Sequence, residues 1–554
     1  MVAPARTACL LLALQAFAAV AAADAGIEAL QRAELRNVIR PIGVDGQGPW
    51  NAKSQFFLYP PTFGFPAVEW AASYRFVVLD DRHERHAFEA GSPNASLAPV
   101  WERLPTGFVT VRVAALDASG REVGTAGERT FWKSAPFRPG AYRRPPRTYA
   151  AAEALLLNGL YESKKASTLR ETGDIDRTYA HNCYPSKMLT ATIAAMVRYA
   201  RTRPDRKDGA VRTACAAADW LIAHSAPDGT PLAGMPPTYD YHQEVKGTQP
   251  ADISLQNSGI SMNIYPAEAA LQFLSLHRLS GDGKYLAAAK KIGDTFVRLQ
   301  EQDGTWPLKQ RFDDGKAVGE NRLQPAGNAL PMLEALYGAT GEAAYRKAAD
   351  RAFWFIERGP LREWTWEAQF EDSNPGAKWF NPTLHGAAST ALHLLRRFPG
   401  DPKRLAQARE LARWCEDQFV FWEKPYGGSR RPREGCVGGA SLLAGKWVDT
   451  GMWRLPGVTE QYTWYLPIDG SAAKMSRLYR ALYRAEGNPL DLAKARALAD
   501  SIVCEQRADG TIQTHWTDLV FDWLNCMVDA GLAVGELGDE LSSAGNGERE
   551  GVTR

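Results

Sequence analysis

The chain has 554 residues, and its 65 Lys and Arg residues nearly balance its 63 Asp and Glu residues, which leaves a formal net charge of +2. No basic cluster with interleaved aromatic residues stands out, so composition and charge exclude a nucleic-acid partner. The hydrophobic content of 45% is that of an ordinary globular protein of enzyme size.

The first 23 residues predict a signal peptide. Arg6 forms a short basic start, residues 8–19 are apolar, and small residues suited to cleavage follow up to Ala23. No later segment approaches 18 uninterrupted apolar residues, so we expect no membrane insertion. These features predict a periplasmic or secreted protein.

Residues 24–137 predict a small β-sandwich of the fibronectin or immunoglobulin type. Short alternating or β-rich runs occur at 55–59, 74–79 and 108–113, separated by Pro, Gly, Asn and Asp. The opening at 60–68 and the late run at 107–117 resemble fibronectin-type modules. Residues 138–147 are rich in Pro and Arg and are expected to be a linker.

From residue 148 onward two kinds of helix alternate. Buried helices start at prolines that precede small and apolar residues, because proline suits the first helical position. These inner helices are expected to start near Pro185, Pro266, Pro325, Pro382, Pro467 and, without a proline, Trp516. Amphipathic outer helices are expected at 149–160, 209–225, 284–300, 342–357, 404–419 and 490–506.

Six inner and six outer helices predict a mainly α fold, a six-hairpin (α/α)6 toroid over residues 148–537, with a disordered tail over 538–554. An open α-solenoid is the alternative, but its repeats are usually shorter and more even. Long insertions before the inner helices favour a closed ring with elaborated loops on one rim.

A β-module followed by such a toroid resembles the six-hairpin glycosidase superfamily. The N-terminal module is similar to the one that precedes the toroid in heparinase-II/III-type polysaccharide lyases. The resemblance covers most of the mature chain and is architectural. It implies an exported enzyme that acts on a poly- or oligosaccharide.

The loops that enter the inner helices should converge on one mouth, where their aromatic, amide and carboxylate side chains suit the C–H faces and hydroxyl groups of sugars. The expected substrate contacts are Asn182, Tyr184, Tyr239, Trp306, Glu320, Asn321, Trp366, His385, Gln461, Tyr462, Trp464 and Asp469. For Asp469, and for Glu268, a partner of the helix dipole is an equally good interpretation, since both lie in the first turn of an inner helix.

Hydrolysis of a glycosidic bond needs two carboxyl groups on facing walls. Glu244, Glu371 and Glu460 come from three different loops and are the predicted acid–base residues of a glycoside hydrolase. A polysaccharide lyase, with Tyr241 or His242 as the base, is the alternative. A non-catalytic glycan-binding protein is the third hypothesis, and an epimerase a minor one.

We expect neither a metal nor a cofactor, because the nine histidines are scattered and none pairs with another His or Cys at ligand spacing. We also expect a monomer.

Overall fold

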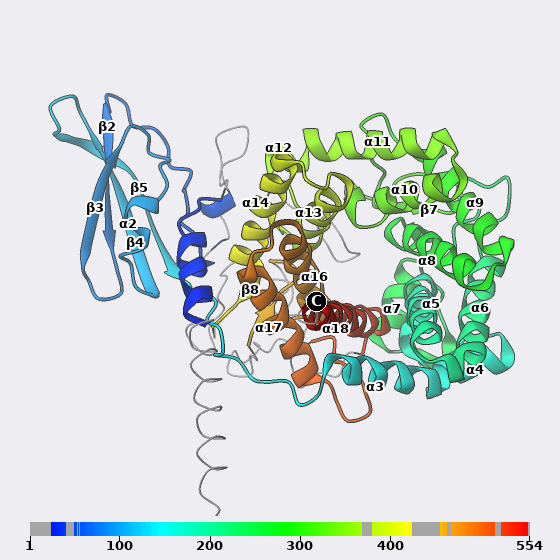
Figure 1. The fold of residues 1–554 in the computed structure, drawn as a ribbon. Coiled ribbons are helices and arrows are strands. Elements are labelled where there is room, and N and C mark those ends of the chain that lie inside the picture. The colour runs from blue at the N-terminus through cyan, green and yellow to red at the C-terminus, as the bar shows by residue number, and fades with distance from the viewer. Residues whose placement is uncertain are drawn as a thin grey trace, which may run out of the picture.

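The computed structural model describes residues 24–39, 49–51, 54, 56–367, 379, 381–423, 455–462, 467–515 and 522–551. A β-sheet lies at one side of a ring of helices (Figure 1). The predicted signal peptide, Glu371 and Trp464 lie outside the described residues.

The sheet has five strands in the order β1-β5-β4-β2-β3. The strands are β1 (Phe56–Phe57), β2 (Ser73–Leu79), β3 (Arg85–Ala90), β4 (Gly107–Leu116) and β5 (Glu122–Lys133). β1 pairs with β5 in parallel, and the other neighbours are antiparallel. In β2 and β4 buried side chains alternate with more exposed ones, so one face of the sheet is apolar.

This face is covered by short segments of the same region. Helix α2 (Ala98–Trp101) places the Trp101 ring 6.1 Å from that of Phe131, and Phe63 lies 5.5 Å from Phe131 between ring centroids. Among the described residues no second sheet faces the first, so the predicted two-sheet sandwich is not found there. Large aromatic side chains on α2 and in the loop after β1 bury the face instead.

The described residues from 149 onward contain six pairs of long helices. The outer helices are α3 (Tyr149–Glu162), α6 (Lys207–Ala223), α9 (Gly283–Leu299), α11 (Ala343–Arg358), α14 (Pro402–Phe419) and α17 (Pro489–Glu505). The inner helices are α5 (Pro185–Thr202), α8 (Ile264–Ser280), α10 (Ala329–Thr340), α13 (Leu384–Arg397), α16 (Asp469–Glu486) and α18 (Leu524–Gly551).

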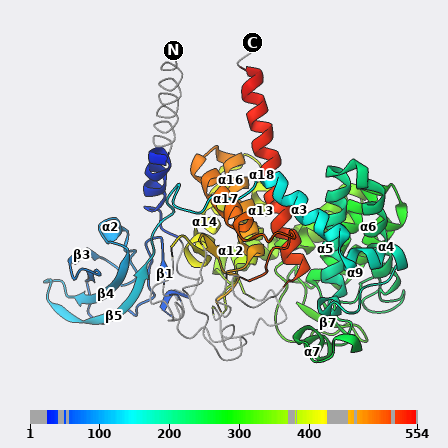
Figure 2. The ribbon, with the colours of Figure 1, turned by 90° about the horizontal axis from the view of Figure 1, so that it is seen from below.

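Shorter elements lie between these pairs. They are the helices α4 (Lys164–Thr172), α7 (Gln249–Gln256) and α12 (Pro360–Glu363), the 3-10 turns η2 (Ala180–Cys183), η4 (Gln243–Val245) and η5 (Pro325–Gly327), and the strands β6 (Ile260–Met262), β7 (Lys309–Arg311), β8 (Val420–Phe421) and β9 (Gly457–Val458). Figure 2 shows α7 and β7 at the side of the ring opposite to the C-terminal end of α18.

The helices close into a ring, which confirms the α/α toroid and excludes the open solenoid. The last inner helix, α18, contacts α16 on one side and both α5 and α3 on the other. The inner helices therefore follow each other around the ring in the order α5, α8, α10, α13, α16, α18. Inner helices carry alanines, glycines and serines that are fully buried, and these small residues let six helices approach one axis.

Most of the predicted inner-helix starts are shifted. α8 begins at Ile264, two residues before Pro266, and α10 begins at Ala329, after a 3-10 turn that contains Pro325. α18 begins at Leu524 and not near Trp516. α13 and α16 begin two residues after Pro382 and Pro467, because Thr383 and Ile468 are extended and form bridges with Gln461 and His515. Pro185, in contrast, is the first residue of α5.

Helix α18 also differs from the prediction, since it continues to Gly551 through residues for which we expected disorder. Leu537 is buried, and the carboxylates of Asp539 and Glu540 pair with Arg198 and with Arg480 and Arg484. These contacts hold the helix against the ring beyond residue 537.

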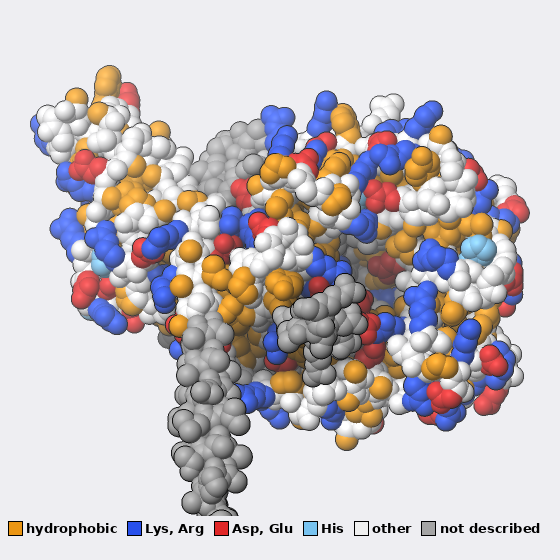
Figure 3. All heavy atoms as spheres, viewed as in Figure 1, with side chains coloured by type: hydrophobic (Ala, Val, Ile, Leu, Met, Phe, Trp, Pro, Cys, Tyr) orange, Lys and Arg blue, Asp and Glu red, His pale blue; other side chains and the backbone are white. Residues whose placement is uncertain are grey.

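On the ring face drawn in Figure 3, basic and acidic side chains are interspersed, and the face is hollowed beside the grey atoms. Within the described part of the chain, no helix combines the length and the apolar character that crossing a membrane requires.

Candidate active site at the ring axis

Each inner helix brings a polar group to the ring axis near its N-terminal end. The groups are Lys187 on α5, Glu268 on α8, Asn328 at the cap of α10, His385 on α13, Lys474 on α16 and Asp529 on α18. The charges of several of these side chains change one another's pKa values across the ring. The charge of Lys474 lowers the pKa of Glu268 and the charge of Asp529 raises it, although α8 lies opposite α16 in the ring order.

His385 and Glu460 form a close pair of titratable groups at the axis. Nε2 of His385 lies 3.0 Å from Oε1 of Glu460, and both side chains are about one-fifth exposed. Burial alone would raise the pKa of Glu460, but its hydrogen bond with His385 and the nearby charge of Lys187 lower it below its ordinary value. Glu460 is therefore an ionised carboxylate at neutral pH.

The imidazole of His385 is held in its neutral form. Burial lowers its pKa, and the nearby charge of Lys474 lowers it further, against the opposing effect of Glu460. A neutral imidazole can accept a proton.

Glu268 is shifted in the opposite direction to Glu460. Burial raises its pKa to about 7, although Lys474, Lys187 and a hydrogen bond with Asn328 act to lower it. A carboxyl group with this pKa keeps its proton for much of the time at neutral pH. The axis thus holds two carboxyl groups whose surroundings separate their pKa values, which is the pattern of an acid and a base.

An aromatic group borders these residues on the side of α5. The ammonium group of Lys187 lies 4.0 Å from the ring centroid of Trp523, which is partly exposed. The centroid of the Trp523 ring lies 5.1 Å from that of Tyr184 and 4.1 Å from that of His181. Burial and Lys187 lower the pKa of His515 to about 4 despite the charge of Glu460. Flat aromatic rings beside charged groups suit the apolar face and hydroxyl groups of a sugar.

The segment that carries Glu460 is fixed on two sides. On one side β9 pairs with β8, and the amide of Thr459 donates to the carbonyl of Phe419 at 2.9 Å. On the other side the amide of Leu384 donates to the carbonyl of Glu460 at 2.9 Å, and Gln461 bridges Thr383. These bonds align Glu460 with His385, which follows Leu384.

The first rim loops bring several predicted residues together. His242 is buried, with Nδ1 3.2 Å from Nη1 of Arg177 and Nε2 3.3 Å from the Asn182 carbonyl, so it joins two loops. Tyr184 and Tyr239 are buried with their ring centroids 5.4 Å apart. Asn182 is also buried, and its side chain donates to the Asp176 carbonyl at 2.9 Å.

Two other members of these loops are more accessible. Tyr241 is partly exposed and donates to Gln243 at 3.1 Å, and Glu244 is exposed within η4. The roles of Tyr241 as the base and of Glu244 as an acid stay predictions, and both residues lie in or beside η4.

Three predicted aromatic contacts are core residues instead. Trp306, Trp366 and Tyr462 are almost completely buried, and Trp306 donates to the Phe296 carbonyl at 2.8 Å. A side chain without exposed surface cannot stack on a sugar, so these three anchor loops onto the ring.

The other predicted contacts are dispersed. Gln461 is buried and accepts a hydrogen bond from Asn381 at 2.9 Å, and Asp469 is buried as the first residue of α16. Glu320 is exposed, and Asn321 is partly exposed in the segment whose carbonyl binds the Leu308 amide at 2.8 Å.

Sequence reasoning missed Lys187, Lys474, Asn328 and Asp529 and gave Glu268 no role. A signal was present, because each is a polar residue near small and apolar residues within the first two turns of an inner helix, or at its cap. Charged side chains are seldom buried among such residues without a reason.

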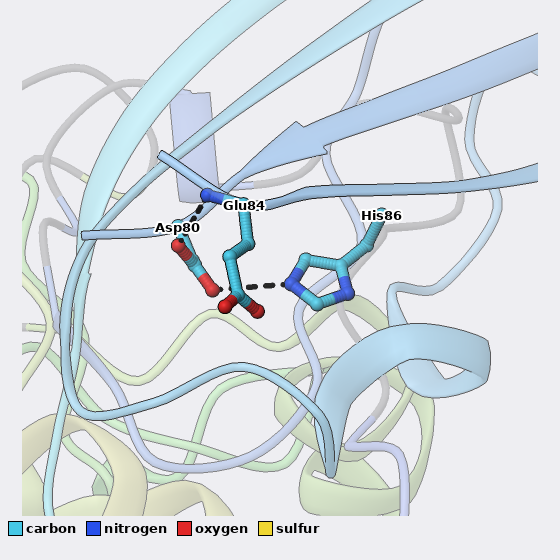
Figure 4. A group of neighbouring side chains, drawn as sticks. All are labelled: Asp80, Glu84 and His86. Carbon is cyan, nitrogen blue, oxygen red and sulfur yellow. Dashed lines mark hydrogen bonds and ion pairs between the residues drawn. The ribbon is translucent and has the colours of Figure 1, made fainter. Parts of the chain in front are cut away.

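One cluster in the sheet has ligand types that suit a metal ion. Asp80, Glu84 and His86 place ligand atoms within 4.8 Å of one another, and Figure 4 shows the three side chains converging at the β2–β3 turn. Asp80 accepts from the amides of Arg82 and Glu84 at 2.9 Å each, and its second oxygen lies 3.1 Å from His86 Nε2. These bonds explain the cluster as the closure of a tight hairpin.

No protein-family model matches the chain, and a search of curated proteins finds no relative. Solved structures with a similar fold include a family 76 glycoside hydrolase from a bovine Bacteroides thetaiotaomicron strain, at 11% identity and a TM-score of 0.44 over 84% of this chain and 93% of that chain. A cellobiose 2-epimerase from Spirochaeta thermophila has 14% identity and a TM-score of 0.45 over 71% of this chain and 98% of that one.

A polysaccharide lyase has 11% identity and a TM-score of 0.40 over 88% of this chain and 63% of its own length. The likeness to all three is one of fold, and the identities are too low to transfer residue roles.

Proposed function

We propose that the protein is a carbohydrate-processing enzyme that hydrolyses a glycosidic bond at the ring axis. The observation that carries the proposal is the separation of two pKa values, with Glu268 raised to about 7 and Glu460 lowered. These carboxyl groups come from different walls of the ring, since Glu268 lies on α8 and Glu460 lies in the segment before α16, against His385 of α13. Glycoside hydrolysis requires such carboxyl groups on facing walls.

In this proposal Glu268 is the general acid that protonates the leaving oxygen. Glu460 is the carboxylate that activates water or attacks the sugar carbon, and the His385 hydrogen bond orients it. Trp523, partly exposed beside Lys187, supplies a stacking surface for the sugar. Export of the protein stays a prediction.

The test uses Glu268→Gln and Glu460→Gln with a panel of neutral and uronic-acid polysaccharides. Release of reducing ends without an unsaturated product, reduced about 100- to 10,000-fold by either substitution, would support hydrolysis. Glu162→Gln is the matched control, since this glutamate is exposed at the end of the outer helix α3 and should leave the rate unchanged. Full activity in both Gln variants at the axis would refute the assignment.

β-Elimination on a uronic-acid glycan is the second candidate, and a specific observation favours it. His385 is kept neutral by burial and by Lys474, so its imidazole could accept the proton of the sugar ring. Lys187 and Lys474 place two ammonium groups at the same axis, where they could neutralise a uronate carboxylate. Reducing ends that appear together with the ultraviolet absorbance of an unsaturated sugar would identify this reaction.

A further inference from the structure

Helix α14 ends beside the segment that carries Glu460, and residues from the N-terminal sheet region are buried at this point. Ser54 and residues Phe56–Tyr59, which we call the docking segment, lie against the last turn of α14. Ser54, Gln418 and Tyr462 are each at most 3% exposed. Contacts between residues so far apart in the chain are unusual for a module joined only by a linker.

A hydrogen-bonded group links the docking segment directly to the Glu460 segment. Oγ of Ser54 donates to Oε1 of Gln418 at 2.9 Å and lies 2.7 Å from the hydroxyl of Tyr462. The Tyr462 hydroxyl also donates to the same oxygen of Gln418. Tyr462 follows Glu460 by two residues, and its amide donates to the Pro382 carbonyl at 3.2 Å.

The docking segment is itself held firmly in place. Oδ1 of Asp417 accepts from the amides of Leu58 at 2.6 Å and Tyr59 at 2.8 Å. The hydroxyl of Tyr59 donates to Glu416 at 2.9 Å, and Glu416 forms an ion pair of 2.7 Å with Lys494 of α17. Fully buried charges paired in this way do not move without a large cost.

We propose that Ser54 is a positioning residue of the active site, which fixes the register of the Glu460 segment through Gln418 and Tyr462. Side chains alternate along an extended segment, so a slip by one residue would turn Glu460 away from His385. The N-terminal region therefore completes the site from outside the ring. This inference rests on the proposed role of Glu460.

Ser54→Ala and Tyr462→Phe each remove one hydroxyl group from the linkage. We expect kcat to fall about 10- to 100-fold with little change in KM, because a misaligned group lowers the rate of the chemical step. The acidic limb of the pH–rate profile should move to higher pH, since Glu460 loses its alignment with His385. Ser54→Thr, which keeps the hydroxyl group, should restore most of the activity.

Thr110→Ala is the matched control. Its hydroxyl lies 2.8 Å from that of Thr130 on the exposed face of the same sheet, so this variant also loses a hydroxyl pair of the N-terminal region. It should leave kcat and the pH profile unchanged. Hydrogen exchange of residues 457–462 should become faster in Ser54→Ala and not in the control.

The outcomes separate this inference from the proposed function. Full activity in Glu460→Gln would refute the role of Glu460 itself. A different result is that Glu460→Gln is inactive while Ser54→Ala and Tyr462→Phe keep the kcat and the acidic limb of the wild-type pH–rate profile. In that case the positioning role is wrong, and the two hydroxyl groups only stabilise the fold, even if both variants have lower thermal stability. Should Ser54→Ala fail to fold, Tyr462→Phe, which changes a single oxygen, decides the question by the same readouts.

Discussion

Glu268 illustrates how a residue in an inner helix changes character through its surroundings. In the sequence it is a glutamate in the first turn of a helix, a position that the helix dipole alone explains. In the folded ring its partners are Lys474, Asp529 and Asn328, all from other inner helices, and burial is the largest influence on its pKa. Only the closed ring creates this environment.

The pH dependence of the rate should report this shift. If Glu268 is the general acid, it must be protonated, so activity should fall as the pH rises through about 7. Glu460 must be ionised, and its lowered pKa should keep the acidic limb below the ordinary carboxyl range. The measurement is kcat/KM as a function of pH, from about pH 4 to about pH 9. A rate that is flat across neutral pH and falls only in strong alkali would contradict the role of Glu268.

His385→Leu should raise the pKa of Glu460. The substitution removes the His385 hydrogen bond, which opposes the effect of burial on the Glu460 pKa, so the acidic limb should move to higher pH. His277→Leu, near the C-terminal end of α8, is the control and should leave the limb in place. If the acidic limb of the pH–rate profile is unchanged in His385→Leu, the ionisation of Glu460 does not determine that limb.

Helices α16 and α18 are joined by a row of charged pairs. Arg477 forms a two-pronged bond with Glu536 at 3.0 and 3.1 Å and also pairs with Asp529, and its side chain is 20% exposed. Arg484, two turns later, pairs with Glu540 at 2.8 Å but is 58% exposed. The same helix thus carries one mostly buried arginine and one exposed arginine, each paired with carboxylates of α18.

Arg477→Met should lower the free energy of unfolding by about 1–3 kcal/mol, because it removes charge-assisted hydrogen bonds to Asp529 and Glu536, whose side chains are themselves partly exposed. Arg484→Met should change it by less than about 1 kcal/mol, since exposed ion pairs contribute little. Urea unfolding followed by tryptophan fluorescence measures both. Equal losses of unfolding free energy in the two variants would show that burial of the arginine does not determine how much these ion pairs stabilise the protein.

For the helices, sequence patterns predicted most of what the structure contains. The amphipathic outer helices lie within a few residues of their predicted bounds, because one apolar stripe is visible in the sequence itself. The starts of α13 and α16 were missed by two residues, since bridges to Gln461 and His515 keep Thr383 and Ile468 extended. Such contacts join distant segments and leave no local signal.

At the scale of the whole molecule, the sheet and the ring share a buried boundary. Tyr59 bonds to Glu416, and Tyr142 of the predicted linker packs on Trp422, with ring centroids 6.0 Å apart. We therefore expect the protein to unfold in a single calorimetric transition, with equal calorimetric and van't Hoff enthalpies. Two resolved transitions would show that the sheet region is an independent module, as the predicted linker at 138–147 suggests.

The sequence by itself determined the alternation of inner and outer helices, and with it the ring, because periodicity and proline positions are local properties of the chain. It also named His385 and Glu460 as candidate site residues. Only the tertiary structure decided that these two residues meet, that Glu268 faces Lys474 across the axis, and that Trp306, Trp366 and Tyr462 are buried. The physical reason is that burial and charge at the axis are sums over six helices, and no single helix contains them.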